Sequence, residues 1–184
     1  MGTRSTISIL NTNGTLNSIY CQFDGYLAGI GESLYMHYNE VEKVEKLISM
    51  GAVVSLQQEI DIPEGALHNF DSRIPNVTVF FQRDDQNNNS HFQSFNFTDL
   101  ANFFENNSFQ GFDYLFKVKN NKWYLINSKN NKLEPLKTKL IKNSDRTDNF
   151  EFFLKNKEIE LNYEKLKLKF NSLFNTNQLK VKKI

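Results

Sequence analysis

The stretch TRSTISILNTNGTLNSIYCQF, residues 3–23, decides the fold at the level of sequence. Two runs of β-branched and aromatic residues flank the tetrapeptide TNGT at residues 12–15. Asn13 and Gly14 tolerate positive φ, which both central residues of a type I′ hairpin turn require. The sequence therefore predicts a β-hairpin in which Thr12 pairs with Thr15.

The predicted register makes one face of this hairpin polar toward its open end. Side chains alternate between the two faces of a strand, so residues directly opposite each other share a face. The polar end leads straight into Asp24. The predicted pairs are Ile7 with Tyr20, Ser5 with Gln22, Arg4 with Phe23 and Thr3 with Asp24.

The segment CQFDGYLAGIG, residues 21–31, follows the hairpin and contains three glycines. From Ala28 the apolar spacing changes to three or four residues, which predicts a short helix with Ile30, Leu34 and Tyr38 on one face. A glycine-rich turn between a strand and a helix can present backbone N–H groups to an anion. The same residues can instead form only a chain reversal, because glycine permits close backbone approach.

The remaining elements indicate an α+β domain. A second helix is expected from Asn39, with Glu42 completing a capping box and Gly51 as a left-handed stop. We expect a mainly antiparallel sheet built from two hairpins plus a further strand, with helices packed on one face. The other expected elements are a short apolar turn followed by an extended loop within 52–75, a strand at 76–83, a helix through Leu100 and Phe103 capped by Asn96 or Thr98, and a second hairpin at 112–128.

The chain is expected to divide at residue 128. Residues 1–128 form the predicted core domain, whereas 129–184 read as a Lys/Asn-rich C-terminal extension. Within the extension, KEIELNYEKLKLKFNSLF at 157–174 has the apolar spacing of an amphipathic helix. The abundance of Asn, Lys and Phe is typical of AT-rich codons, so the asparagines are not interpreted as a site.

Composition limits the classes of function. Lys+Arg 22 against Asp+Glu 21 gives a net charge of +1, which provides no global field toward nucleic acid or membrane. No apolar run approaches the roughly 18 residues of a membrane helix. A single cysteine, Cys21, and an N-terminus without signal-peptide character favour the cytoplasm. The aromatic content predicts core packing ahead of base stacking.

The candidate ligand-binding residues lie at the open end of the hairpin and in one later pair. A bidentate arginine clamp for a phosphate or a carboxylate is one interpretation, and a structural ion-pair network is the other. His37, His68 and His91 are isolated and predict no metal site. Cys21 lacks a neighbouring base, so we expect a buried thiol without a catalytic role. The candidates are Arg4, Ser5, Gln22, Asp24, Gly25, Tyr26, Arg83 and Asp84.

Several blocks together resemble a widespread family of small phage-encoded and prophage-encoded proteins of uncharacterised function. They are GTRSTISI, GTLNSIYCQFDGYLAGIGESLYMHYNEVEKVEKLISMG, the Arg83-Asp84 pair and FDYLFKVKNNKWYLI. The family pattern is TRS…IYCxWDGYxxGxG…HY…EKVxxLI, and the resemblance covers residues 2–128. Gln22-Phe23 stands where the relatives commonly show His-Trp, and Leu27-Ala28 where they show Pro-Glu. If that histidine were a catalytic base, its absence here would favour binding or a structural role.

The resemblance and the residues lead to three hypotheses. The first is a non-enzymatic phage accessory protein in the cytoplasm of the infected bacterial host, without a cofactor. It would inhibit or redirect a host system, such as a defence system, by binding a host protein or a small anionic, nucleotide-like ligand. The second is a virion-associated structural protein that docks through its C-terminal helix. The third is a nucleotide- or phosphoester-directed enzyme, with Asp24 or Asp84 as base and Arg4 or Arg83 as clamp. A homodimer is the default assembly.

Overall fold

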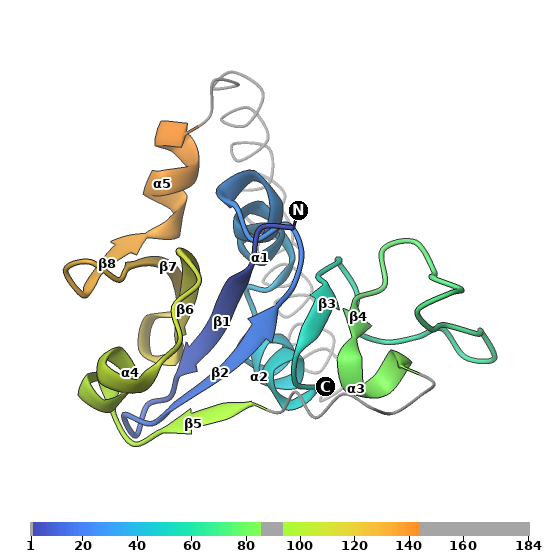
Figure 1. Ribbon diagram of the computed structural model, residues 1–184, viewed down its shortest axis with the longest axis horizontal. Coiled ribbons are helices and arrows are strands. Elements are labelled where there is room, and N and C mark those ends of the chain that lie inside the picture. Colours follow the sequence, from blue (N-terminus) through green and yellow to red (C-terminus); the bar gives the residue numbers. More distant parts are fainter. Residues whose placement is uncertain (1, 86–93, 144–184) are drawn as a thin grey trace, which may run out of the picture. The chain divides into compact units, whose positions relative to one another are not determined.

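The computed structural model describes residues 2–85 and 94–143, and its first compact unit extends to Asn143. These residues form an α+β fold around one sheet (Figure 1). The strand order is β4-β3-β2-β1-β6-β7-β8, with β5 paired to β2 beside β3. The strands are β1 (Ser5–Leu10), β2 (Leu16–Cys21), β3 (Val53–Ser55), β4 (Val79–Phe80), β5 (Phe95–Phe97), β6 (Phe112–Lys117), β7 (Lys122–Asn127) and β8 (Lys132–Pro135).

The helices are short and divide between the two faces of the sheet. The Tyr114 hydroxyl of β6 and the Trp123 Nε1 of β7 donate to the carbonyl oxygens of Gly25 and Tyr38, which flank the first two helical segments on one face of the sheet. Helix α4 packs against the opposite face (Figure 1). The segments are a π-helical turn η1 (Leu27–Gly31), α1 (Glu32–His37), α2 (Val41–Ser49), α3 (Phe81–Asp84), α4 (Leu100–Asn106), a 3₁₀ turn η2 (Val118–Asn120) and α5 (Leu136–Asn143).

The sheet is mostly antiparallel, but its central pair is parallel. Strand β1 pairs in parallel with β6 over six residues, and β2 meets β3 in parallel at Cys21 and Val53. The other strand pairs are antiparallel. A parallel pair needs a long crossover connection, and here the chain between β1 and β6 contains the other strands and helices through α4. The central strand pair of the sheet therefore joins residues that are far apart in the sequence.

The first hairpin forms as predicted, but its register differs by one residue. Only Gly14 has positive φ in the turn, at 91°, and the N–H of Asn11 donates to the carbonyl oxygen of Thr15 at 2.9 Å. This is a three-residue loop with a left-handed glycine rather than a two-residue type I′ turn. Leu10 consequently pairs with Leu16, and Ser5 pairs with Cys21 instead of Gln22.

The predicted helix caps are wrong by one to three residues. Helix α2 begins after Glu40, which makes no side-chain cap bond, and Asn39 instead lies 3.5 Å from the Met36 carbonyl oxygen. Helix α4 is capped by Asp99, whose carboxylate accepts from the N–H of Asn102 at 2.9 Å. The core-facing side of α2 is confirmed in Val44, Leu47 and Ile48, and its left-handed stop in Gly51 with φ 80°.

Two segments were assigned the wrong secondary structure. Val53–Ser55 is strand β3 where an apolar turn was predicted, and the strand predicted at 76–83 shortens to the two residues of β4. The chain then turns into α3, which places Arg83 and Asp84 on a helical turn. A single bridge between Glu59 and Val77 pins the long loop that precedes β4.

The second hairpin is confirmed and continues into a further strand and helix. Strands β6 and β7 pair around Asn121, which adopts a left-handed conformation with φ 53°. Strand β8 pairs with β7, and α5 follows it. Both lie beyond residue 128, where the sequence placed the start of the extension, yet within the first compact unit. The amphipathic helix expected at 157–174 lies outside the described residues.

The chain reverses direction directly after β2 by close backbone contact. The N–H of Gly25 donates to the carbonyl oxygen of Thr3 at 2.8 Å, and the N–H of Ile30 donates to that of Asp24 at 2.8 Å. A Cβ added at Gly25 would lie 2.4 Å from the carbonyl oxygen of Arg4. Glycine is therefore required at residue 25 by the space available rather than by φ.

We predict that Gly25→Ala lowers the free energy of unfolding by about 2 kcal/mol or more, because the methyl group forces the reversal away from β1. Gly65→Asn is the control, since a Cβ at Gly65 meets nothing within 4 Å and asparagine tolerates its φ of 73°. Urea denaturation of both variants measures the difference. An equal, small effect in the two variants would contradict the packing argument.

Candidate functional site

A pocket of about 530 Å³ lies on the face of the sheet opposite η1 and α1. Its floor consists of alternate residues of the first hairpin, namely Arg4, Thr6, Tyr20 and Gln22. Thr6 pairs with Tyr20, and continuing this register places Arg4 beside Gln22. The predicted polar end of the hairpin therefore exists, but the one-residue change in register brings Arg4 onto it and moves Ser5 to the other face.

The walls of the pocket come from segments that follow the hairpin by many residues. Phe81 from the start of α3 lines it together with residues of β5 and the segment after α4. These residues bring aromatic rings, carboxamides and a hydroxyl to the pocket. They are Phe95, Asn96 and Phe97 on one side, and Asn106, Asn107, Ser108 and Gln110 on the other.

The pocket exists because α4 covers only half of this face. A cluster around Leu16, Phe97, Phe103, Leu115 and Ile126 packs under α4 at the end of the sheet near the hairpin turn. Phe103 meets Phe97 edge-to-face at 5.1 Å. Toward the open end of the hairpin the same face becomes polar and stays uncovered by α4. The boundary between apolar and polar side chains therefore sets the edge of the pocket.

A buried carboxylate holds the floor in place. Asp113 is fully buried and accepts from the Thr6 hydroxyl at 2.6 Å and from the Thr6 N–H at 3.2 Å. It also accepts from the N–H groups of Gln110 and Gly111 at about 3.0 Å. Full hydrogen bonding offsets the cost of burying this charge. The network fixes one wall and the floor as a single unit.

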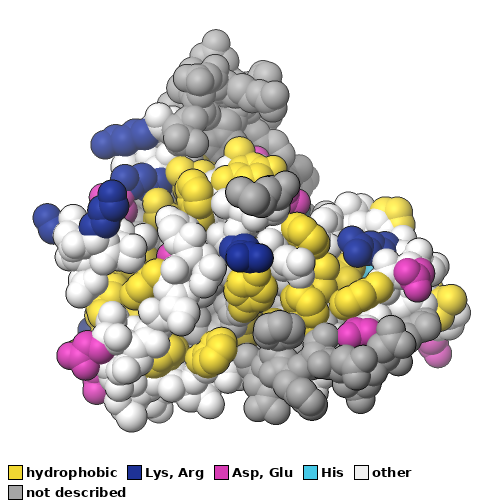
Figure 2. All heavy atoms as spheres, viewed as in Figure 1, with side chains coloured by type: hydrophobic (Ala, Val, Ile, Leu, Met, Phe, Trp, Pro, Cys, Tyr) yellow, Lys and Arg dark blue, Asp and Glu magenta, His cyan; other side chains and the backbone are white. Residues whose placement is uncertain are grey.

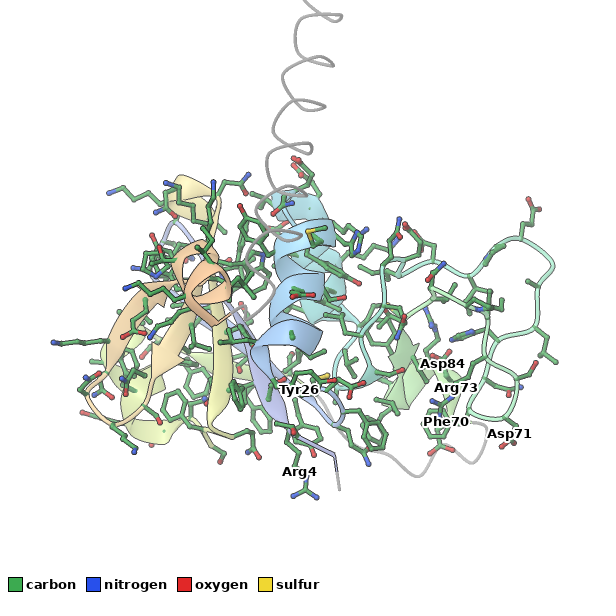
Figure 3. The ribbon with its side chains drawn as sticks, turned by 90° about the horizontal axis from the view of Figure 1, so that it is seen from above. Arg4, Tyr26, Phe70, Asp71, Arg73 and Asp84 are labelled. Atoms are coloured by element: carbon green, nitrogen blue, oxygen red, sulfur yellow. The ribbon has the colours of Figure 1, made fainter. Side chains whose placement is uncertain are left out.

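Arg4 supplies the positive charge of the pocket. Its side chain is exposed and makes no hydrogen bond or ion pair with any described residue. In Figure 3 it projects away from the ribbon on the side opposite α1 and α2. Figure 2 shows hydrophobic side chains gathered near the centre of this face, with acidic groups toward its periphery. An unpaired guanidinium beside apolar rings is suited to an anionic group.

One polar atom in the pocket wall has no protein partner. The Nδ2 of Asn107 is buried and has no hydrogen-bond partner within residues 2–85 and 94–143. An unpaired buried donor costs about 1–3 kcal/mol. Because this atom has almost no surface accessible to solvent, an acceptor on a bound molecule reaches it only when the Asn107 side chain turns toward the pocket.

The Asp24-Gly25-Tyr26 segment belongs to the chain reversal and does not line the pocket. Asp24 is exposed with φ 58°, and Tyr26 is partly exposed. The carbonyl oxygen of Gly25 accepts from the Tyr114 hydroxyl at 2.9 Å, which ties the reversal to β6. Of the candidate residues at the hairpin, the structure brings only Arg4 and Gln22 into the pocket.

Arg83 and Asp84 form a separate, internally paired network. The Arg83 Nε and Nη2 donate to the Asp84 carboxylate at 2.6 and 2.8 Å. The guanidinium also donates to the carbonyl oxygens of Ile60 and Thr78, both at 2.5 Å. Four of its five N–H groups are thereby used. Figure 3 shows Asp84 well apart from Arg4 and Tyr26. The pair joins the long loop to β4.

His68 extends this network into the loop. Its Nδ1 accepts from the N–H of Ile74 at 3.0 Å, so the proton of the neutral ring lies on Nε2. Nε2 faces the Asp84 carboxylate at 3.5 Å, too far for a full hydrogen bond. Both side chains are fully buried. His68 therefore acts as a loop anchor.

Other reactive groups of the described residues lie in the core. Burial raises the pKa of the Cys21 thiol to about 12, and burial also raises the pKa values of Tyr38 and Tyr114. No group of three potential metal ligands occurs in the described part of the chain, and His91 lies outside it. No helix in this part is long and apolar enough to cross a membrane.

We predict that Asp84→Asn lowers the free energy of unfolding by about 2 kcal/mol, because the partly buried Arg83 loses the opposing charge of a fully buried carboxylate. The matched control is Asp61→Asn, which removes the exposed ion pair with Lys46 at 2.6 Å and should cost less than about 1 kcal/mol. Denaturant unfolding monitored by tryptophan fluorescence compares the two. Similar small losses would show that the network does not anchor the loop.

We predict that Cys21 does not react with a thiol reagent at pH 8 in the folded protein but reacts fully in guanidinium. In the folded protein the pKa of the Cys21 thiol is about 12, against an ordinary 9.0. The buried protonated thiol therefore stabilises the folded state fully below pH 9, and this stabilisation falls as the pH rises toward 12. Colorimetric thiol titration and urea unfolding at pH 8 and 10 measure both effects, with Cys21→Ala as control. Rapid labelling at pH 8 without denaturant would contradict the buried assignment.

No known family model, curated protein or solved structure matches this chain. Conclusions about its function consequently rest on the residues and geometry of the pocket. Sequence reasoning missed the pocket residues of β5 and of the segment after α4. The available signal was the run ANFFENNSFQ at 101–110, whose asparagines were attributed to codon composition.

Proposed function

We propose that this chain is a non-enzymatic binding protein that holds a small, anionic, nucleotide-like ligand in the pocket between the first hairpin, β5 and α4. The proposal depends on one observation: the guanidinium of Arg4, which has no partner among the described residues, lies in the same pocket as the exposed ring of Phe95 and several side-chain amides. A phosphate pairs with a guanidinium, a base stacks on aromatic faces, and amides match the polar edge of a base.

The dimensions of the pocket support a small ligand. Its volume of about 530 Å³ lies inside the range of about 300–1,000 Å³ usual for small-molecule sites. The rigid floor supports binding as well, because Thr6 is held by Asp113 at 2.6 Å and loses little freedom when a ligand arrives. A preformed polar floor beside Phe95, which is 58% exposed, favours capture of an amphipathic molecule.

The lining of the pocket favours binding over catalysis. The described lining residues include no carboxylate, imidazole, thiol or amine, so the hydroxyls of Thr6, Tyr20 and Ser108 have no general base among them to activate them. Asp84, a candidate base, is occupied by Arg83 and the Phe80 N–H. Asp24 lies outside the pocket. The enzyme hypothesis therefore has less support than the binding hypothesis.

The biological setting of the proposal comes from the resemblance to phage-encoded proteins. A phage accessory protein with such a pocket would withdraw a nucleotide-like signal in the cytoplasm of its host and so inhibit or redirect the host system that uses it, such as a defence system. Binding by sequestration needs no cofactor. The virion-associated alternative depends on the helix expected at 157–174, which lies outside the described residues.

We expect the full chain, purified from a bacterial host, to retain a small molecule that native mass spectrometry detects and a denatured extract identifies. Arg4→Ala should weaken binding of that molecule about 10- to 100-fold, because a hydrogen bond to a charged group contributes about 1.5–3 kcal/mol. The melting temperature should stay unchanged, since Arg4 is exposed and makes no hydrogen bond or ion pair within residues 2–85 and 94–143.

Arg73→Ala is the matched control for this experiment. Arg73 is also exposed, but it bonds to the Phe70 carbonyl oxygen at 3.1 Å and does not line the pocket. It should therefore leave the bound mass unchanged. A clean mass without ligand, together with no binding from a panel of nucleotides, would overturn the proposed function. The same spectra test the expected homodimer.

A further inference from the structure

We infer that the ligand is a nucleoside monophosphate, which combines one planar base with a single phosphate group. This inference rests on the proposed function and deepens it by naming the class of ligand. It follows from three features of the pocket: its charge, its unpartnered amide and its exposed ring.

The charge of the pocket matches one phosphate group rather than several. Arg4 is the cation among the described lining residues, and no lysine joins it. Further phosphates would lie without a counter-charge. A triphosphate thus gains no contact over a monophosphate.

The amide of Asn107 provides a contact that a base can use. Its buried Nδ2 has no partner among the described residues, and Gln22 and Asn96 bring further amides to the same pocket. Carboxamides recognise bases by pairing a donor and an acceptor with the base edge. When the Asn107 side chain turns toward the pocket, a ring nitrogen or a carbonyl oxygen of a base would satisfy its Nδ2. A sugar phosphate has no base to place against the aromatic wall and make this contact.

The aromatic wall provides a surface for the base. Phe95 is 58% exposed although it lies in strand β5, two residues before buried Phe97. Phe81 lines the pocket from α3. A base stacked on such rings removes apolar surface from water and is tolerant of base identity. The base therefore supplies much of the binding, and the phosphate contact with Arg4 adds to it.

Calorimetric titration of the full chain tests this inference. The monophosphates of the four common ribonucleosides are compared first. The nucleoside whose monophosphate binds most tightly is then tested as the free nucleoside, the monophosphate, the diphosphate and the triphosphate, with ribose 5-phosphate beside them. We expect the diphosphate and triphosphate to bind no more tightly than the monophosphate. Ribose 5-phosphate and the nucleoside should each bind about tenfold more weakly or worse.

Two variants separate the phosphate contact from the base contact. Arg4→Ala should weaken binding of the monophosphate about tenfold but change binding of the nucleoside less than twofold. Asn107→Leu should weaken binding of the monophosphate and of the nucleoside about tenfold. It should also raise the melting temperature of the protein, because it removes a buried donor that has no partner among the described residues. Asn130→Leu, outside the pocket, is the matched control and should leave affinity unchanged.

The outcomes distinguish this inference from the proposed function. Affinity that rises with each added phosphate, ribose 5-phosphate that binds as tightly as the monophosphate, or Asn107→Leu without effect on affinity would overturn the inference alone. Absence of binding by every member of the series, in a protein that also carries no retained ligand, would overturn both.

Discussion

The buried carboxylate of Asp113 holds together the two strands at the centre of the sheet. It accepts from both the N–H and the hydroxyl of Thr6, 107 positions away in the sequence. Parallel pairing of β1 with β6 is therefore accompanied by a side-chain bond in the same register. The N–H groups of Gln110 and Gly111 donate the further hydrogen bonds to this carboxylate. Because this charge has no access to water, any shift of β6 along β1 would leave it unsatisfied.

The position of the pocket follows from this central pair. The chain reaches β6 by crossing the sheet through β5 and α4, so α4 lies over part of the face that carries Leu16 and Leu115. The remainder of that face, where Thr6 and Tyr20 lie, is walled by β5 and the segment after α4 and forms the pocket. The opposite face is filled instead: Trp123 donates to the carbonyl oxygen of Tyr38 at 2.7 Å. One face is thus core, and the other is divided between core and pocket.

The sequence predicted some elements well because their signals are local. The second hairpin and the apolar side of α2 depend on alternation and helical spacing within a few residues, and both are confirmed. The first hairpin was predicted with a register one residue wrong, because Asn13-Gly14 is compatible with two turn lengths and only Gly14 adopts positive φ. That single residue decides which side chains share the pocket, so Ser5 was placed on the wrong face and Arg4 was paired with the wrong partner.

Composition and local pattern by themselves determined the α+β class, the first hairpin and the presence of polar residues at its open end. Tertiary structure alone decided what those residues do. Arg4 and Arg83 look equivalent as charged residues in β-rich segments. Arg4 lies in a pocket with no partner in the described part of the chain, whereas Arg83 is held by Asp84 and two carbonyl oxygens. The difference arises from contacts with Ile60, Thr78 and the segment after α4. Such contacts depend on how distant strands are brought together, which the spacing of residues along a chain does not encode locally.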